Sequence, residues 1–164
     1  MPEQQNIRLN LGCSTDYRAG YINVDKSLKF KADLYFDLEA AWPLASDTFI
    51  EIYASHIVEH IVDLRLFFRE SHRVLIKNGV LHIKAPWWSG HWAVGDPTHV
   101  RLINDMTFNP WSCWFDRYPH IKDGCQFHQV KEVFNPDPGW GKDPFLKKGG
   151  FSEIEEYEVF LKRL

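Results

Sequence analysis

The chain has 164 residues, of which 45% are hydrophobic and 25% are charged, and its formal net charge is -3 at pH 7. This length fits a single domain over residues 1–164, with a core that needs no metal or disulfide to fold. The small net charge, without a long run of one sign, argues against a surface that binds duplex nucleic acid. Three scattered cysteines indicate a reducing, cytoplasmic setting. No apolar run approaches the ~18 residues of a membrane helix, so we expect no membrane association.

The first elements form a strand, a glycine turn and a second strand that ends in an acid. Residues 7–11 read as a short apolar strand that leads into Gly12 and Cys13, and residues 21–25 read as a strand that ends at Asp25. In open α/β sheets a glycine at this place lets the backbone approach a nucleoside, and the acid accepts hydrogen bonds from ribose hydroxyls. The pattern therefore indicates a nucleoside site.

The next elements continue an α/β pattern. Residues 33–37 and 49–54 read as strands, and from Ile57 the apolar period becomes helical, to about Ile76. We expect Asn78 and Gly79 to end this helix with a left-handed cap, and residues 80–85 to form a strand that Pro86 stops. Residues 7–86 would thus form the cofactor half of the domain.

The second half, about residues 87–150, is aromatic and irregular, with a short helix near residues 104–108. Residues 126–134 and 155–161 read as strands, and prolines and glycines make residues 135–150 a loop. We predict an α/β domain with a minimal Rossmann-like sheet, mostly parallel with an antiparallel C-terminal strand pair.

The connections between the first strands are short. Only the nine residues from Gly12 to Gly20 separate strands one and two, whereas a parallel crossover normally takes a dozen or more, usually with a helix. We therefore expect turns in place of helices, and apolar sheet surface that is exposed or covered by a partner. A homodimer is the simplest such partner.

Four landmarks follow successive strands. They are Gly12, Asp25, the pair Asp37 and Leu38, and the pair Ser55 and His56. Ligands of doubly wound sheets bind outside the carboxyl ends of the strands, so we expect all four landmarks to face one crevice.

Three further segments complete a recognisable set of sequence motifs. They read SHIVEHI over residues 55–61, RVLIKNGVL over residues 73–81 and DPTHVR over residues 96–101, with Phe108 beyond. With the first strands, they resemble the LNLGCG, NVD, HxxEH, RVLxxGGxL and DPxHxRxF segments of small class I S-adenosylmethionine-dependent methyltransferases. The resemblance covers about residues 7–108. The usual second glycine of the first turn is Ser14 in this chain.

The resemblance implies where S-adenosylmethionine would lie. Gly12 and the backbone near Cys13 would pass close to the methionine part, Asp25 would hold the ribose hydroxyls, and Asp37 and Leu38 would border the adenine.

The resemblance also implies that Ser55 and His56 would lie beside the methionine part and the transferred methyl. Methyl transfer is an in-line displacement in which a hydroxyl or amine acceptor must lose its proton, and histidine is the usual base. We take His99 as the candidate base, with Asp96 to orient it. The same stretch is also a good turn signal.

Neighbouring groups have structural interpretations as well. His56 could pack the turn after its strand, Glu59 suits the first turn of a helix through the helix dipole, and His60 reads as a helix-face residue rather than a ligand. The spacing of Cys125 and His128 is suggestive of a zinc site, but Cys113 and His120 match no standard zinc spacing, so we expect no metal site.

Five of the seven tryptophans fall between residues 87 and 114, where they would roof the crevice: Trp87, Trp88, Trp92, Trp111 and Trp114. Flat aromatic faces stack on sugars and bases, but the same residues could form a second core or a dimer contact.

We therefore predict a methyltransferase that uses S-adenosylmethionine and acts on a small-molecule or carbohydrate-like (glycan-like) acceptor. One alternative is a protein that binds the cofactor without catalysis, as a partner or regulatory subunit. Another is an enzyme that uses a different nucleoside such as NAD, against which the short first crossover and the absent G-x-G-x-x-G argue.

Overall fold

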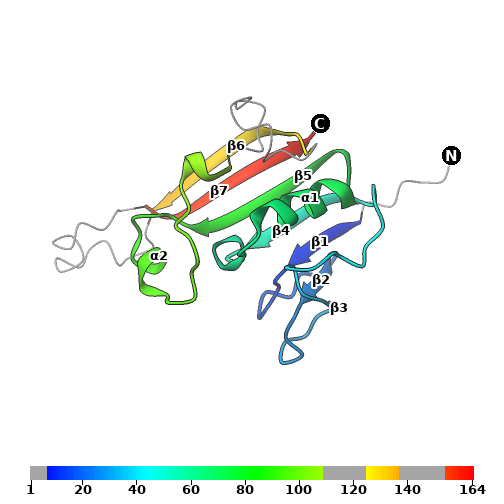
Figure 1. The fold of residues 1–164 in the computed structure, drawn as a ribbon, viewed down its shortest axis with the longest axis horizontal. Helices are drawn as coiled ribbons and strands as arrows, with labels where there is room; N and C mark the ends of the chain where they lie inside the picture. Colours follow the sequence, from blue (N-terminus) through cyan, green and yellow to red (C-terminus); the bar gives the residue numbers. More distant parts are fainter. Residues whose placement is uncertain (1–6, 109–124, 137–153) are drawn as a thin grey trace.

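The computed structural model describes residues 7–108, 125–136 and 154–164 (Figure 1). In this part, the strands are β1 (Arg8–Leu11), β2 (Ile22–Asp25), β3 (Leu34–Tyr35), β4 (Phe49–Ser55), β5 (Leu75–Pro86), β6 (Phe127–Pro136) and β7 (Ile154–Arg163). The α-helices are α1 (Leu64–Val74) and α2 (His91–Gly95), and the 3-10 helices are η1 (Val58–His60) and η2 (Asp105–Phe108). No helix of these residues is long and apolar enough to cross a membrane.

All seven strands form one sheet in the order β3-β2-β1-β4-β5-β7-β6. The pairs β2–β3, β1–β2, β1–β4 and β4–β5 are parallel. β7 runs antiparallel to both β5 and β6. The predicted fold class, a mostly parallel sheet with an antiparallel C-terminal pair, is confirmed.

One face of the sheet carries the core. In Figure 1, α1 lies over β4 and β5. Alternate residues of the central strands are fully buried on this face, in one apolar cluster with Phe67 and Phe68 of the helix. The helix begins at Asp63, whose carboxylate accepts hydrogen bonds from the backbone N–H groups of Arg65 and Leu66, at 2.9 and 3.1 Å. Such a cap satisfies donors that a helix start leaves without partners.

The helix predicted from Ile57 to Ile76 is wrong at both ends. Residues 58–60 form the separate turn η1, and the backbone is extended at Ile61 before α1 begins. The Glu39 carboxylate accepts hydrogen bonds from the backbone N–H groups of Val62 and Asp63, which fixes this break. The helical period was a poor guide here because a tertiary contact, invisible to it, determines the backbone.

The C-terminal end of that prediction fails for a different reason. The strand β5 starts at Leu75, which pairs with Phe49, and the next paired position is Val80 with Glu51. Residues 76–79 thus bulge from the ladder. Asn78 does take the predicted left-handed conformation, with φ +67, but inside the bulge rather than at a helix cap.

The face of the sheet opposite α1 has no covering helix in the described residues, as the short connections predicted. The expectation of exposed apolar surface there is wrong, because this face is polar and aromatic. Arg8 pairs with Glu51 at 3.2 Å, His82 contacts Glu158 at 2.9 Å, and the His82 ring stacks on another ring of β7. The reason given for a homodimer is thereby removed.

The strands at the C-terminal end match their predictions within two residues at each end. In the aromatic region, Trp87 packs against Phe134 and Tyr157, with ring centroids 5.2 and 5.7 Å apart. Trp87 thus joins the core, as the structural interpretation allowed. Trp88 and Trp92 are exposed. Trp111 and Trp114, Cys113 and His120, and most of the predicted loop 135–150 lie outside the described residues.

Candidate functional site

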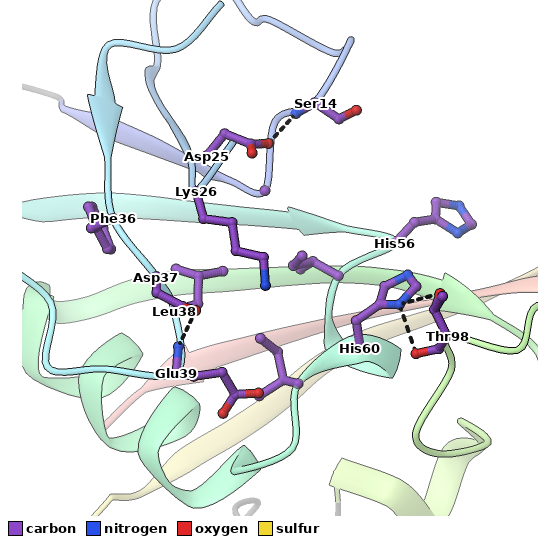
Figure 2. Close-up of a pocket in the computed structure, with 13 residues that line it drawn as sticks. Ser14, Asp25, Lys26, Phe36, Asp37, Leu38, Glu39, His56, His60 and Thr98 are labelled. Carbon is purple, nitrogen blue, oxygen red and sulfur yellow. Dashed lines mark hydrogen bonds between the residues drawn. The ribbon is translucent and has the colours of Figure 1, made fainter. Parts of the chain in front are cut away.

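A pocket of about 420 Å³ lies beyond the carboxyl ends of β1, β2 and β4 (Figure 2). Its volume falls within the range of about 300–1,000 Å³ typical of small-molecule sites. The residues that line it are Gly12, Ser14, Asp25, Lys26, Phe36, Asp37, Leu38, Glu39, His56, Ile57, His60, Ile61 and Thr98.

Position 12, in the turn after β1, favours glycine. Gly12 has φ +63, and a Cβ added there would lie 2.7 and 2.8 Å from two side-chain atoms of Ile57. Ser14, where the resembling family has glycine, also adopts a left-handed backbone, with φ +45. The Ser14 N–H donates to Asp25 Oδ2 at 2.8 Å, which fixes this conformation (Figure 2). A serine is therefore held in a left-handed backbone conformation in this turn by its hydrogen bond to Asp25.

Asp25 sits where an acid can meet a nucleoside. Its side chain is largely buried at the end of β2, and its second oxygen accepts a hydrogen bond from the Ser27 N–H at 2.8 Å. The two backbone donors hold the carboxylate in one orientation, and each oxygen keeps a lone pair for a further donor. The carboxylate is therefore both fixed and able to accept ligand hydroxyls.

The segment after β3 forms one wall of the pocket. Phe36 and Leu38 contribute apolar side chains, and the Trp42 Nε1–H donates to the Leu38 carbonyl at 3.2 Å. Asp37 is exposed, and its Oδ1 accepts from the Glu39 N–H at 3.0 Å. This wall suits a flat, partly apolar ligand group with a polar edge.

His56, at the end of β4, has a left-handed backbone with φ +51 and a hydrogen bond from its N–H to the Lys84 carbonyl. Two carboxylates flank its ring, Glu59 at 3.5 Å and Glu156 at 3.0 Å. Hydrogen bonding and charge from Glu59, with a further contribution from Glu156, raise the pKa of His56 above its ordinary value, against the effect of burial.

The far end of the pocket joins η1 to the loop after α2. His60 Nδ1 lies 3.2 Å from both the carbonyl oxygen and the hydroxyl of Thr98 (Figure 2). His99 lies beside this end with its ring centroid 4.8 Å from that of His60, but it does not line the pocket. Asp96 Oδ2 is 3.8 Å from His99 Nε2, beyond hydrogen-bond length.

Asp96 is engaged elsewhere. Its Oδ1 accepts from the Thr98 N–H and hydroxyl at 2.8 and 2.6 Å, and these bonds lower the pKa of Asp96. The ring of His99 is instead oriented by the Ala93 carbonyl, whose oxygen lies 3.0 Å from His99 Nδ1.

The structure brings most of the predicted cofactor residues together. Gly12, Asp25, Asp37, Leu38 and His56 line one pocket, as the four strand-end landmarks predicted. Two others are not among the lining residues. The Cys13 side chain is buried with its thiol 3.6 Å from the Lys31 carbonyl, and Ser55 is half-buried in β4.

Several lining residues were not anticipated. Lys26, whose side chain points into the pocket in Figure 2, and Phe36 each lie one position from a predicted landmark. Ile57 and Ile61 were assigned to a helical stripe, and they line the pocket because that helix does not form. The signal available was adjacency in the chain to a strand end.

The strand order and the pocket beyond the parallel strands define the class I methyltransferase fold. A solved S-adenosylmethionine-dependent methyltransferase from Archaeoglobus fulgidus has a TM-score of 0.69 at 16% identity, over 96% of this chain and 86% of its own. An S-adenosylmethionine-dependent methyltransferase from Mesorhizobium loti has a TM-score of 0.62 at 15% identity, over 99% and 94%. The [4+2]-cyclase SpnF shares the fold at 0.64 and 12% identity, over 95% and 74%.

A comparison of the sequence agrees with the comparison of the fold. The family model of a methyltransferase domain matches residues 9–83. A search of curated proteins gave no significant match. Together, the fold and the family match confirm the resemblance to class I S-adenosylmethionine-dependent methyltransferases.

Proposed function

We propose that this chain binds S-adenosylmethionine in the pocket and transfers its methyl group to a small-molecule or carbohydrate-like acceptor. The observation that carries the proposal is the paired geometry at Gly12 and Asp25. Gly12, which has no side chain, packs closely on Ile57, and beside it the fixed carboxylate of Asp25 ends the neighbouring strand. This pair is what a nucleoside with a ribose diol requires.

The cofactor would lie along the lining residues in a definite order. Its ribose would bind Asp25, and its adenine would lie against Phe36, Asp37 and Leu38. The methionine part would then extend past Gly12, with the sulfonium methyl directed toward the His60 end. Support for this order comes from the lining of the pocket and from the roles that the resemblance implies.

The acceptor would enter at the end formed by His60 and Thr98. The segment between β5 and Thr98 exposes Trp88 and Trp92, with exposed fractions of 46% and 53%. Thr98, on the same connection after β5, lines the pocket, and exposed aromatic faces on such a connection favour a flat or sugar-like acceptor. His99 is the candidate base for the acceptor proton. A carbonyl can only accept, so His99 Nδ1 donates to the Ala93 carbonyl, and Nε2 keeps a lone pair that can take the proton.

Calorimetric titration of the purified protein with S-adenosylmethionine and S-adenosylhomocysteine tests the cofactor part. We expect micromolar binding that Asp25→Asn weakens at least tenfold, because one oxygen that accepts from ribose becomes an amide. The matched control is Asp105→Asn, an exposed acid of η2 outside the pocket lining, which should bind as the wild type does. No binding by the wild type would overturn the proposal.

A cofactor-binding protein without methyl transfer is the second candidate, favoured by the [4+2]-cyclase that shares this fold. The two are separated by S-adenosylhomocysteine production during a screen of hydroxylated acceptors that begins with sugars. A methylated product with any acceptor would exclude the second candidate. Binding without product across the screen would favour it.

A further inference from the structure

Three groups with metal-ligating chemistry converge beside the acceptor end of the pocket. Glu59 and His60 come from η1, and His99 comes from the loop after α2, about forty residues later. One ligand atom from each residue lies within 4.8 Å of the other two. Tertiary structure alone creates this cluster, and the sequence spacing did not suggest it.

Each histidine is held through its Nδ1 by a backbone carbonyl. His99 Nδ1 faces the Ala93 carbonyl at 3.0 Å, and His60 Nδ1 faces the Thr98 carbonyl at 3.2 Å. Because a carbonyl only accepts, each Nδ1 carries the hydrogen and each Nε2 keeps a lone pair. Backbone carbonyls that fix the tautomer in this way are the usual outer partners of metal-binding histidines.

Glu59 supplies the independent observation. Its side chain is 2% exposed, and its Oε2 is buried without a hydrogen-bond partner. The contact with His56, at 3.5 Å, engages only Oε1. A buried carboxylate oxygen without a donor is unfavourable, and a bound cation would satisfy it.

We propose that Glu59, His60 and His99 form a site for a divalent transition-metal ion, of the zinc, cobalt or manganese type, at the acceptor end of the pocket. Two imidazoles and one carboxylate are a donor set for such ions, and three protein ligands leave a position open for another oxygen. His60 and its neighbour Thr98 line the pocket, so the open position would face the acceptor.

This inference rests on the proposed function and assigns the ion a role in it. The ion would bind the acceptor hydroxyl as a Lewis acid and ease the loss of its proton to water. The acceptor oxygen then forms the bond to the methyl carbon, the carbon–sulfur bond breaks, and its electron pair stays on sulfur. A nitrogen that holds an ion cannot also take a proton, so the ion would replace His99 as the activating group.

The test is titration of the metal-stripped, full-length protein with Co²⁺ and Zn²⁺, followed by calorimetry and by visible absorption of the cobalt form. We expect one equivalent to bind, with affinity reduced at least tenfold by Glu59→Gln, His60→Asn and His99→Asn separately. The matched control is His72→Asn, on α1 and outside the cluster, which should bind cobalt unchanged. Cobalt bands typical of oxygen and nitrogen ligands are expected, whereas a strong thiolate band would contradict the site.

Binding of S-adenosylmethionine is measured on the same variants, and it separates the two proposals. Retained cofactor binding with lost cobalt binding shows that a variant is folded and supports the metal site. If one variant fails to fold, the other two decide. No cobalt binding by the wild type, or binding that all three substitutions leave unchanged, would overturn the metal site whether or not the cofactor binds.

Discussion

The two faces of the sheet are stabilised by different interactions. The face under α1 buries apolar side chains such as Leu11 and Ile52, and the helix adds Phe68; all three are fully buried. The opposite face carries ion pairs, among them Arg8 with Glu51. Apolar burial contributes roughly 25 cal/mol per Å², whereas a solvent-exposed ion pair contributes about 0–1 kcal/mol. The fold should therefore depend on the covered face, while the open face can change its side chains at little cost.

The largest expected effect is on the covered face. Phe68 is fully buried against Phe67, Phe108 and Phe127. Phe68→Ala should lower the free energy of unfolding by about 3–5 kcal/mol, because it removes a ring and leaves a cavity. Urea unfolding followed by fluorescence measures this. Val62→Ala, at an exposed position of the preceding loop, should cost little, and equal losses in the two variants would contradict the comparison.

A substitution at Gly12 tests whether ligand binding in the pocket depends on packing at the covered face. Gly12→Ala should weaken S-adenosylmethionine binding at least tenfold and destabilise the fold by about 1–3 kcal/mol, since it adds strain and a clash with Ile57. Gly20→Ala is a sharp control, because Gly20 also has a left-handed backbone, with φ +81, but nothing lies within 4 Å of an added Cβ. It should show strain alone, with normal binding. Equal binding by the two variants would refute the proposed role of Gly12.

A charged pair at the edge of the covered core gives a pH test. Glu70 accepts two hydrogen bonds from Arg73 and one from the Trp42 N–H, and these lower the pKa of Glu70 below its ordinary 4.5. Its ionised form thus stabilises the folded state above pH 4.5, and this contribution is lost as the pH falls through the folded-state pKa. Glu70→Gln should cost about 1–3 kcal/mol at pH 7.

Thermal unfolding of the wild type and Glu70→Gln between pH 3 and 7 measures that difference. We expect it to shrink below pH 4.5. A difference that stays constant over this range would show that the charge of Glu70 does not carry the effect.

The smallest effect is expected on the open face. Arg8 is about half exposed where it pairs with Glu51. Arg8→Met should change the free energy of unfolding by no more than about 1 kcal/mol, and added salt should reduce the difference further. A loss comparable to that of Phe68→Ala would show that the open face carries stability after all.

The sequence predicted the residues at the strand ends better than it predicted the helix. The landmarks Gly12, Asp25 and Asp37 were predictable because the carboxyl ends of parallel strands share one edge, so chain order is enough to place them together. The helix from Ile57 was not, because its apolar spacing also fits a broken segment whose side chains line a pocket. The contact of Glu39 with the backbone of Val62, which joins positions 23 residues apart, has no local signature.

The polar open face and the Glu59 cluster show the same limit. Short connections correctly predicted the missing helices, but not what the uncovered strands would carry, since alternation assigns residues to two faces without saying which face is covered.

By itself, the sequence determined the fold class, the strands along the chain and most of the pocket's strand-end residues, because period and turn chemistry are local or nearly local constraints. Only the tertiary structure decided that Gly12 packs on Ile57, that Asp96 bonds to Thr98 rather than His99, and that a buried Glu59 meets two histidines. Those contacts join residues far apart in the chain, and their geometry depends on how every intervening element packs.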